Sequence, residues 1–350
     1  MTGIQSYIAA LEDAFHAAAA RCGETATRSY RIAGHMVHVA FAGRSLLPIL
    51  TPALEHLAVE PGDEEGLRIL AWDQASATTA MPTPPWSWQS YRSRGEIGGL
   101  DPVRFRVWYH LASGILSIVD LVNRRAFQWL RDSRDVPVYV VAAPFRMILN
   151  AWLNRSGLHF AHAAAVGTEA GGLLMAGPSG SGKSATSLAC LEAAMDFLGD
   201  DYCIVAARPE ARVHSVYCSA KTDDEMLKNL PGLLPSRQRR NDPPGEKALL
   251  LLRERHAERL VSSRRLLAFL APTVCDQRYS TLEPVKALIA VRALAPTTME
   301  QVAGPDASAW ETILSLAGQL PCYRLRLGHD IGSTAPLLSG LIAELSEGSQ

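Results

Sequence analysis

The sequence predicts a C-terminal α/β domain built around a mixed β-sheet, preceded by a strand-rich α+β domain. Two observations carry this prediction. The first part of the chain shows one amphipathic helix followed by several strand-like stretches. Further along, a glycine-rich segment, GPSGSGKS at 177–184, stands between a strand-like stretch and a helix-like one. With 350 residues the chain is long enough for two domains, which we place at 1–143 and 144–350.

Composition and charge narrow the range of partners. Hydrophobic residues make up 48% of the chain and charged residues 20%, which is typical of a globular protein with a sizeable core. The formal net charge is -1, so the chain has no electrostatic footprint for nucleic acid or an anionic membrane. The six scattered cysteines form no CxxC pair, which favours free thiols over a disulfide frame or a zinc site.

The N-terminus and the apolar runs indicate where the protein resides. The first 24 residues lack the basic start of a secretory signal and carry acidic residues among the apolar ones. Apolar runs such as ALIAV and ALLLL are too short to cross a bilayer. We therefore expect a cytoplasmic protein, with neither nucleic acid nor a membrane as its partner.

The elements of the first domain follow from local patterns. We expect a helix at 1–24, a strand or hairpin at 30–43, a short helix within 45–57, a strand at 67–73, a loop at 74–100 and a meander at 104–130. The alternation of apolar residues is clearest at 30–43. The meander should turn at Ser113–Gly114, and its aromatic residues should belong to the core.

The second domain begins with a helix that starts at a proline and ends at a glycine. We expect that helix at 144–157, strands at 158–167, 171–176, 197–205 and 275–294, and helices at 184–195, 306–320 and 335–348. The basic, proline-rich stretch at 235–247 is either a solvated surface loop or a lid over an anionic site.

The segment 177–184 satisfies the G-x-x-x-x-G-K-[ST] pattern of a phosphate-binding loop. Its members Gly177, Pro178, Ser179, Gly180, Ser181, Gly182, Lys183 and Ser184 are all predicted to contact a nucleotide. Glycines let the backbone N–H groups approach phosphate oxygens, and the following helix presents its positive end to them. Lys183 should reach the β- and γ-phosphates, and the Ser184 hydroxyl should hold Mg²⁺. ATP and Mg²⁺ are therefore the expected cofactors.

Two further features flank this loop. Asp200 and Asp201 follow Lys183 closely, and paired carboxylates beside such a loop can divide labour between a base and a metal ligand. Taken alone, the pair reads more simply as a charged turn before a strand. His162 precedes the loop in a small, apolar, strand-like stretch, where a histidine is more often a core residue, as we expect for His159.

Together, His162, GPSGSGKS and Asp200–Asp201 resemble the catalytic core of the HPr kinase/phosphorylase family. The resemblance covers about 158–206 and implies an HPr kinase-like serine kinase domain at 144–350. It implies that Asp200 is the general base, that Asp201 and Ser184 hold Mg²⁺, and that His162 orients the base. The branch that this chain resembles includes kinases that phosphorylate a serine of a precursor peptide, as in lasso peptide biosynthesis.

The chain also departs from the family pattern. Ala185 stands where true HPr kinases have an acidic residue, and their downstream glycine-rich signature is missing, so the resemblance does not extend to phosphorylase activity or to HPr as substrate. True HPr kinases form oligomers, so a homo-oligomer is one state consistent with the resemblance. Further candidates for phosphate or substrate contact are Lys221, Lys247 and one of Arg237, Arg239 and Arg240.

Three functions fit these residues. The first is an ATP-dependent serine kinase for a peptide or protein; the second is a nucleotide-binding regulatory or assembly module; the third is a small-molecule kinase. The absence of an LSGGQ-like segment argues against a transporter ATPase, and the absence of an NKxD segment argues against a GTPase switch.

Overall fold

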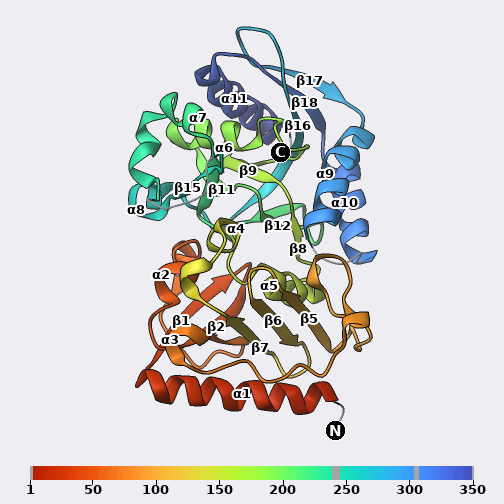
Figure 1. The fold of residues 1–350 in the computed structure, drawn as a ribbon. Helices are drawn as coiled ribbons and strands as arrows, with labels where there is room; N and C mark the ends of the chain where they lie inside the picture. The colour runs from red at the N-terminus through yellow and green to blue at the C-terminus, as the bar shows by residue number, and fades with distance from the viewer. Residues whose placement is uncertain (1–2, 239–244, 303–306, 349–350) are drawn as a thin grey trace. The chain divides into compact units, whose positions relative to one another are not determined.

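The computed structural model describes residues 3–238, 245–302 and 307–348, and its contacts divide the chain into two units (Figure 1). The units are Met1–Trp152 and Leu153–Gln350, whereas the sequence placed the division between residues 143 and 144. The difference is helix α5 (Arg146–Leu153), all of which except its last residue belongs to the first unit. The ring of Phe145, just before it, lies 6.4 Å from the ring of Phe41.

The first unit is built on a seven-stranded mixed sheet. Its strands are β1 (Thr25–Ile32), β2 (His35–Ala42), β3 (Ala58–Val59), β4 (Leu67–Asp73), β5 (Phe105–His110), β6 (Ile115–Asp120) and β7 (Arg125–Leu130). They run in the order β3-β1-β2-β4-β7-β6-β5, with β4 parallel to both of its neighbours. The stretch 30–43, predicted as a strand or hairpin, is the second part of a hairpin that begins at Thr25: β1 and β2 meet at Ala33 and Gly34, which both have positive φ, as a tight hairpin turn requires. The expected meander of β5, β6 and β7 is confirmed.

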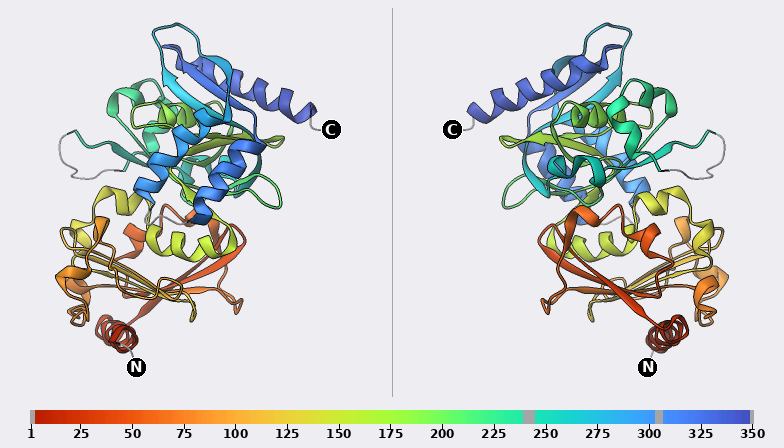
Figure 2. Two further views of the ribbon diagram at one scale, coloured as in Figure 1. Left: turned by 90° about the vertical axis from the view of Figure 1, so that its right-hand side faces the viewer. Right: turned by 90° about the vertical axis from the view of Figure 1, so that its left-hand side faces the viewer.

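Helix α1 (Gly3–Cys22) covers one face of this sheet (Figures 1 and 2). Its buried residues recur at helical spacing, with Leu11 and Phe15 facing Trp72 and Phe127 of the sheet. The remaining elements of this unit are short: α2 (Leu47–Leu50), α3 (Gln74–Ala77), α4 (Val138–Ala142) and 3₁₀ turns. Pro48 lies in the first turn of α2, where a missing N–H costs nothing.

The second unit contains a nine-stranded mixed sheet. Its strands are β8 (His159–Ala161), β9 (Ala164–Thr168), β10 (Gly171–Met175), β11 (Asp196–Gly199), β12 (Cys203–Ala206), β13 (Arg212–His214), β16 (Ser263–Val274), β17 (Thr281–Val285) and β18 (Cys322–Leu327). β10 and β18 run parallel to β16, and the other pairings are antiparallel. A separate ribbon joins β14 (Ser219–Thr222) to β15 (Ala248–Leu251). This mixed α/β architecture agrees with the fold class predicted for the unit.

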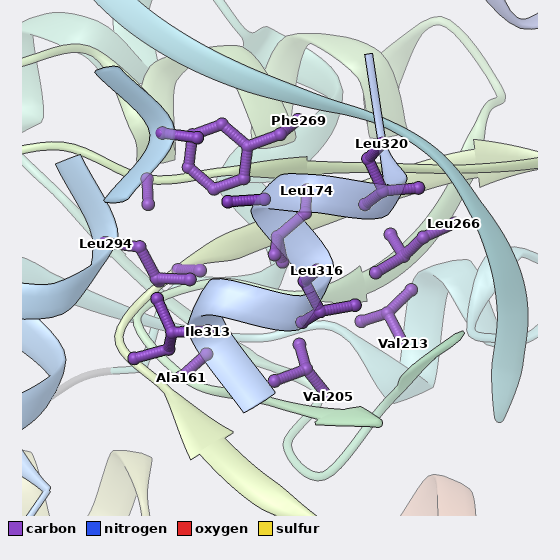
Figure 3. Packing of buried hydrophobic residues seen from close by; sticks show 14 of the residues in the cluster. Ala161, Leu174, Val205, Val213, Leu266, Phe269, Leu294, Ile313, Leu316 and Leu320 are labelled. Atoms are coloured by element: carbon purple, nitrogen blue, oxygen red, sulfur yellow. The ribbon is translucent and has the colours of Figure 1, made fainter. Parts of the chain in front are cut away.

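Helices cover both faces of the nine-stranded sheet. On one face, α9 (Ala287–Gln301) and α10 (Ala307–Gln319) pack Leu294 and Leu316 against Leu174 and Phe269 (Figure 3). On the other, α6 (Lys183–Glu192) and α11 (Thr334–Glu347) cover a second core. Alternate residues of β10 enter the two cores, as the period of a strand dictates.

One sequence expectation for this unit needs correction, and two strands were missed. The stretch 275–294 was predicted to be a strand, but only Thr281–Val285 is one, and its second half opens helix α9. An apolar run such as ALIAV does not distinguish the two states, and here the buried positions Ala290, Leu294 and Thr298 follow a helical period. The long central strand β16 and its neighbour β18 were not predicted at all.

None of the helices within the described residues is long and apolar enough to span a bilayer.

The packing of α10 gives a test of this architecture. Leu316 is 1% exposed, so Leu316→Ala should leave a cavity and lower the free energy of unfolding by about 2–5 kcal/mol. Leu314 lies on the same helix but is 54% exposed, so Leu314→Ala should change it by no more than about 0.5 kcal/mol. Urea denaturation of both variants measures the difference, and equal effects would contradict the packing described here.

Candidate functional site

The glycine-rich loop joins the end of β10 to the start of α6. The helix begins at Lys183, and Gly182 caps it with a φ of 100°. A side chain at that position would be strained and would also collide with Leu327. The loop therefore delivers the N-terminus of α6 to one end of a pocket, which is the arrangement that phosphate binding uses.

The loop residues divide into those that line the pocket and those that shape it. Ser179, Gly180, Gly182, Lys183 and Ser184 line it, together with Ala185, whereas Gly177, Pro178 and Ser181 do not. Lys183 donates from Nζ to the carbonyl oxygens of Gly177 at 2.7 Å and Pro178 at 3.2 Å. Burial lowers the pKa of Lys183, while Asp200 and Asp201 act in the opposite sense. The Lys183 ammonium is thus bound by two backbone carbonyl oxygens, which phosphate oxygens could replace.

The loop fits a bound phosphate. The Ser181 hydroxyl is buried with no hydrogen-bond partner among the described residues. Gly180 has a φ of 80° and open space where a Cβ would stand, so its backbone remains accessible to a ligand. Exposed backbone at the start of a helix is what an anion-binding concavity offers a ligand, whereas the Ser181 hydroxyl lies outside the pocket lining.

The two aspartates lie in the tight turn that follows β11. Asp201 has a φ of 62°, in the left-handed region that a residue with a Cβ adopts at a cost. Asp200 is 3% exposed and does not line the pocket, whereas Asp201 does. The turn therefore separates two adjacent carboxylates into one buried group and one group that faces the pocket.

Lys221, on β14, contacts both carboxylates. Its Nζ lies 2.9 Å from Oδ2 of Asp201, and its backbone N–H donates to Oδ2 of Asp200 at 3.3 Å. The sequence suggested Lys221 as a contact for phosphate or substrate, but in this structure its ammonium is paired with Asp201. The residue thus holds the aspartate pair in place.

The two carboxylates have opposite electrostatic environments. Burial, and then the charge of Asp201, raise the pKa of Asp200 to about 7, and the Ser184 hydroxyl and the Lys221 amide only partly offset this. Burial alone would also raise the pKa of Asp201, but His162 and Lys221 together bring it below its ordinary value. Oδ1 of Asp200 is buried without a hydrogen-bond partner among the described residues.

His162 lies at the bend between β8 and β9 rather than within a strand beside the P-loop strand. Its Nε2 is 3.7 Å from Oδ1 of Asp201, and its backbone N–H donates to Oγ1 of Thr298 at 3.0 Å. The histidine thus neighbours Asp201, and no contact joins it to Asp200. His159, by contrast, is buried in β8 and does not line the pocket.

The pocket has a volume of about 430 Å³ and extends from the loop to His162, Asp201 and Lys221. Its lining also includes Gln301, the last residue of α9, which sequence reasoning missed. Lys247 lines the pocket as well, and Arg237 pairs with Asp224 at 2.9 Å. Arg239 and Arg240 lie outside the described residues, as does part of the stretch predicted to be a surface loop or lid.

The donor set agrees with a magnesium–nucleotide complex. Within the described ranges, no group of three or more His, Cys, Asp or Glu side chains could hold a metal by itself. Mg²⁺ commonly needs only one or two carboxylates, with the substrate phosphates and water completing its shell. Ser184 lines the pocket, and its hydroxyl interacts with the carboxylate of Asp200, which lies behind the lining, so these two residues would hold such an ion.

Comparison with known proteins adds little to this picture. No protein-family model and no curated protein sequence matches the chain. A solved structure titled as an Hpr(Ser) kinase/phosphatase from Coxiella burnetii aligns with 55% of this chain and 95% of its own, at 10% sequence identity and a TM-score of 0.27. Similarity at that level is too low to support a shared fold or activity, so the function must be inferred from the site.

The raised pKa of Asp200 predicts a pH-dependent cost to stability. In the range between the ordinary value of 3.8 and about 7, the folded state holds a proton that the unfolded chain has lost. The free energy of unfolding contributed by this group should therefore fall as pH rises through that range. Asp200→Asn removes the ionisation and keeps an acceptor for Lys221, so it should be more stable than the parent protein at pH 8.

Thermal unfolding at pH 4 and pH 8 measures this effect. The stabilisation by Asp200→Asn should be clear at pH 8 and small near pH 4, where the folded parent carries the proton and the unfolded chain has only begun to lose it. A variant that is less stable than the parent at pH 8 would show that ionised Asp200 stabilises the fold instead.

Proposed function

We propose that this protein is an ATP-dependent kinase that transfers the γ-phosphate to a serine hydroxyl of a peptide or protein. The observation that carries the proposal is one pocket that is lined both by the glycine-rich loop and by Asp201, His162 and Lys221. A site that only held a nucleotide would not need a carboxylate beyond the phosphates, facing the place where an acceptor would enter.

At the phosphate end, the loop residues would bind and orient the nucleotide. Backbone N–H groups of Gly180, Gly182 and Lys183 would contact phosphate oxygens, and the Lys183 ammonium would exchange its present carbonyl partners for them. Lys247 lines the same end and would add a second positive charge. When bound, Mg²⁺ supplies charge neutralisation for the β- and γ-phosphates.

The geometry favours a division of labour that is the reverse of the one predicted from sequence. Asp200 is buried near the Ser184 hydroxyl, so we assign these two residues to the metal. Asp201 faces the pocket beside His162, so we assign Asp201 as the base. Its low pKa keeps it ionised at neutral pH, and a base that abstracts a proton late in a loose phosphoryl transfer need not be strong.

The phosphate transfer needs no reactant besides ATP and the acceptor serine. The serine oxygen forms a bond to the γ-phosphorus, and the bond from that phosphorus to the bridging oxygen of ADP breaks. The serine proton passes to Oδ1 of Asp201, where His162 can accept or relay it. Lys221 keeps the carboxylate aligned through its contact with Oδ2, so the two oxygens of Asp201 serve different partners.

The identity of the acceptor remains a proposal from the sequence resemblance. A ribosomal precursor peptide, such as that of a lasso peptide, is the acceptor class that the resemblance suggests. A cytoplasmic location and assembly as a homo-oligomer remain predictions of the same kind.

Phosphotransfer and its dependence on Asp201 can be measured directly. Purified protein with Mg²⁺, ATP and a serine-containing peptide library should yield peptides heavier by one phosphate in mass spectrometry. Asp201→Asn keeps the shape but removes the base, so kcat should fall about a hundredfold or more. Asp200→Asn should instead raise the Mg²⁺ concentration needed for half-maximal rate, because it weakens the proposed metal ligand.

The control variants separate ATP binding from phosphate transfer. Lys183→Ala should weaken ATP binding and thereby reduce transfer, whereas Asp201→Asn should leave ATP binding near that of the parent protein. Tight ATP binding without transfer to any peptide would favour a regulatory module. A large loss of kcat in Asp200→Asn with Asp201→Asn unaffected would restore the assignment made from sequence.

A further inference from the structure

The acceptor end of the pocket contains a carboxamide that the proposed chemistry does not use. Gln301 ends helix α9 and lines the pocket with His162, Asp201 and Lys221. The Tyr202 hydroxyl donates to its Oε1 at 2.9 Å. Since Tyr202 directly follows Asp201, the carboxamide is anchored to the same turn that carries the proposed base.

A second contact joins the same helix to the site. Thr298, one turn before Gln301 on α9, is 2% exposed and accepts the backbone N–H of His162. The ring of Tyr202 lies 5.7 Å from the ring of His162, so the two anchors are themselves neighbours. The end of α9 is therefore held at both the histidine and the aspartate turn, and the position of Gln301 is defined.

The hydrogen bond from Tyr202 leaves half of the carboxamide unused. With Oε1 occupied, the Nε2 amino group makes no hydrogen bond to any of the described residues and has two N–H donors to offer. If the oxygen and nitrogen exchanged places, the free group would be an acceptor instead. Either arrangement complements one half of a peptide group, which has a carbonyl acceptor and an N–H donor.

We infer that Gln301 binds a backbone peptide group of the acceptor next to its serine, and that Tyr202 positions Gln301 for this contact. The inference rests on the proposed function and narrows its substrate to a polypeptide. A serine flanked by peptide groups would place one of them at Gln301 and its hydroxyl at Asp201. A simple alcohol could reach Asp201 but would make no hydrogen bond to the carboxamide, so it would gain less affinity than a peptide.

The test uses a minimal probe and measures binding, so that it does not depend on turnover. N-acetylserine methylamide contains the hydroxyl with a peptide group on each side, and ethylene glycol has hydroxyls without any peptide group. Saturation-transfer NMR, with the protein loaded with Mg²⁺ and AMPPCP, should show binding of the serine probe and a clear preference for it over ethylene glycol. Gln301→Ala should reduce this preference about three- to tenfold, as expected for the loss of one hydrogen bond.

Two further variants keep the result interpretable. Tyr202→Phe retains the ring but removes the anchor, so it should reduce the preference by a smaller factor than Gln301→Ala. Gln319→Ala is the matched control, because Gln319 ends α10, bonds to Ser315 and does not line the pocket. It should keep the preference of the parent protein.

The contrary outcomes are equally specific. A parent protein that shows no preference for the serine probe, or a Gln301→Ala variant with an unchanged preference, would overturn the inference. Failure of transfer to every peptide in the library would count against the proposed kinase activity. It would leave this binding result standing, so the two failures can be told apart.

Discussion

The tight turn at Asp200 and Asp201 is the constraint on which the site depends. The left-handed backbone at Asp201 sends one carboxylate into the protein and the other toward the pocket. Lys221 stabilises both, through its backbone at the first and its ammonium at the second. Lys221, on β14, thereby offsets part of the repulsion between two adjacent acids in a region of low dielectric constant.

The turn at Asp200 and Asp201 has two features that lower the stability of the fold. A buried carboxyl with an unpartnered oxygen and a backbone in the left-handed region are both unfavourable in an isolated fold. Both lie beside the loop at 177–184. Its Lys183 ammonium is bound by backbone carbonyl oxygens, and its Ser181 hydroxyl has no hydrogen-bond partner among the described residues. Such a concentration of unmet polar groups is expected where a ligand with charge and oxygen atoms is to complete the site.

Local sequence predicted the strand–loop–helix arrangement at 171–192 well, and it did not predict the contribution of helix α9 to the pocket. The loop, the strand before it and the helix after it follow from a short motif, because all of their determining residues are adjacent. Gln301 and Thr298 reach the site from a helix that begins in a stretch predicted to be a strand. Their contribution depends on long-range packing of α9 against the sheet, which local patterns do not encode. The sequence-based assignment of Asp200 as the base and Asp201 as a metal ligand rested on the family resemblance, because only the turn geometry distinguishes the two acids.

The central claim is that the phosphate bound by the loop faces the carboxylate of Asp201. A crystal structure of the protein with Mg²⁺ and the non-hydrolysable analogue AMPPNP tests it most directly. The account predicts that the γ-phosphate lies in the pocket between Lys183 and Asp201, with the metal at Ser184 and Asp200. A nucleotide bound elsewhere, or one whose γ-phosphate points away from Asp201, would contradict it.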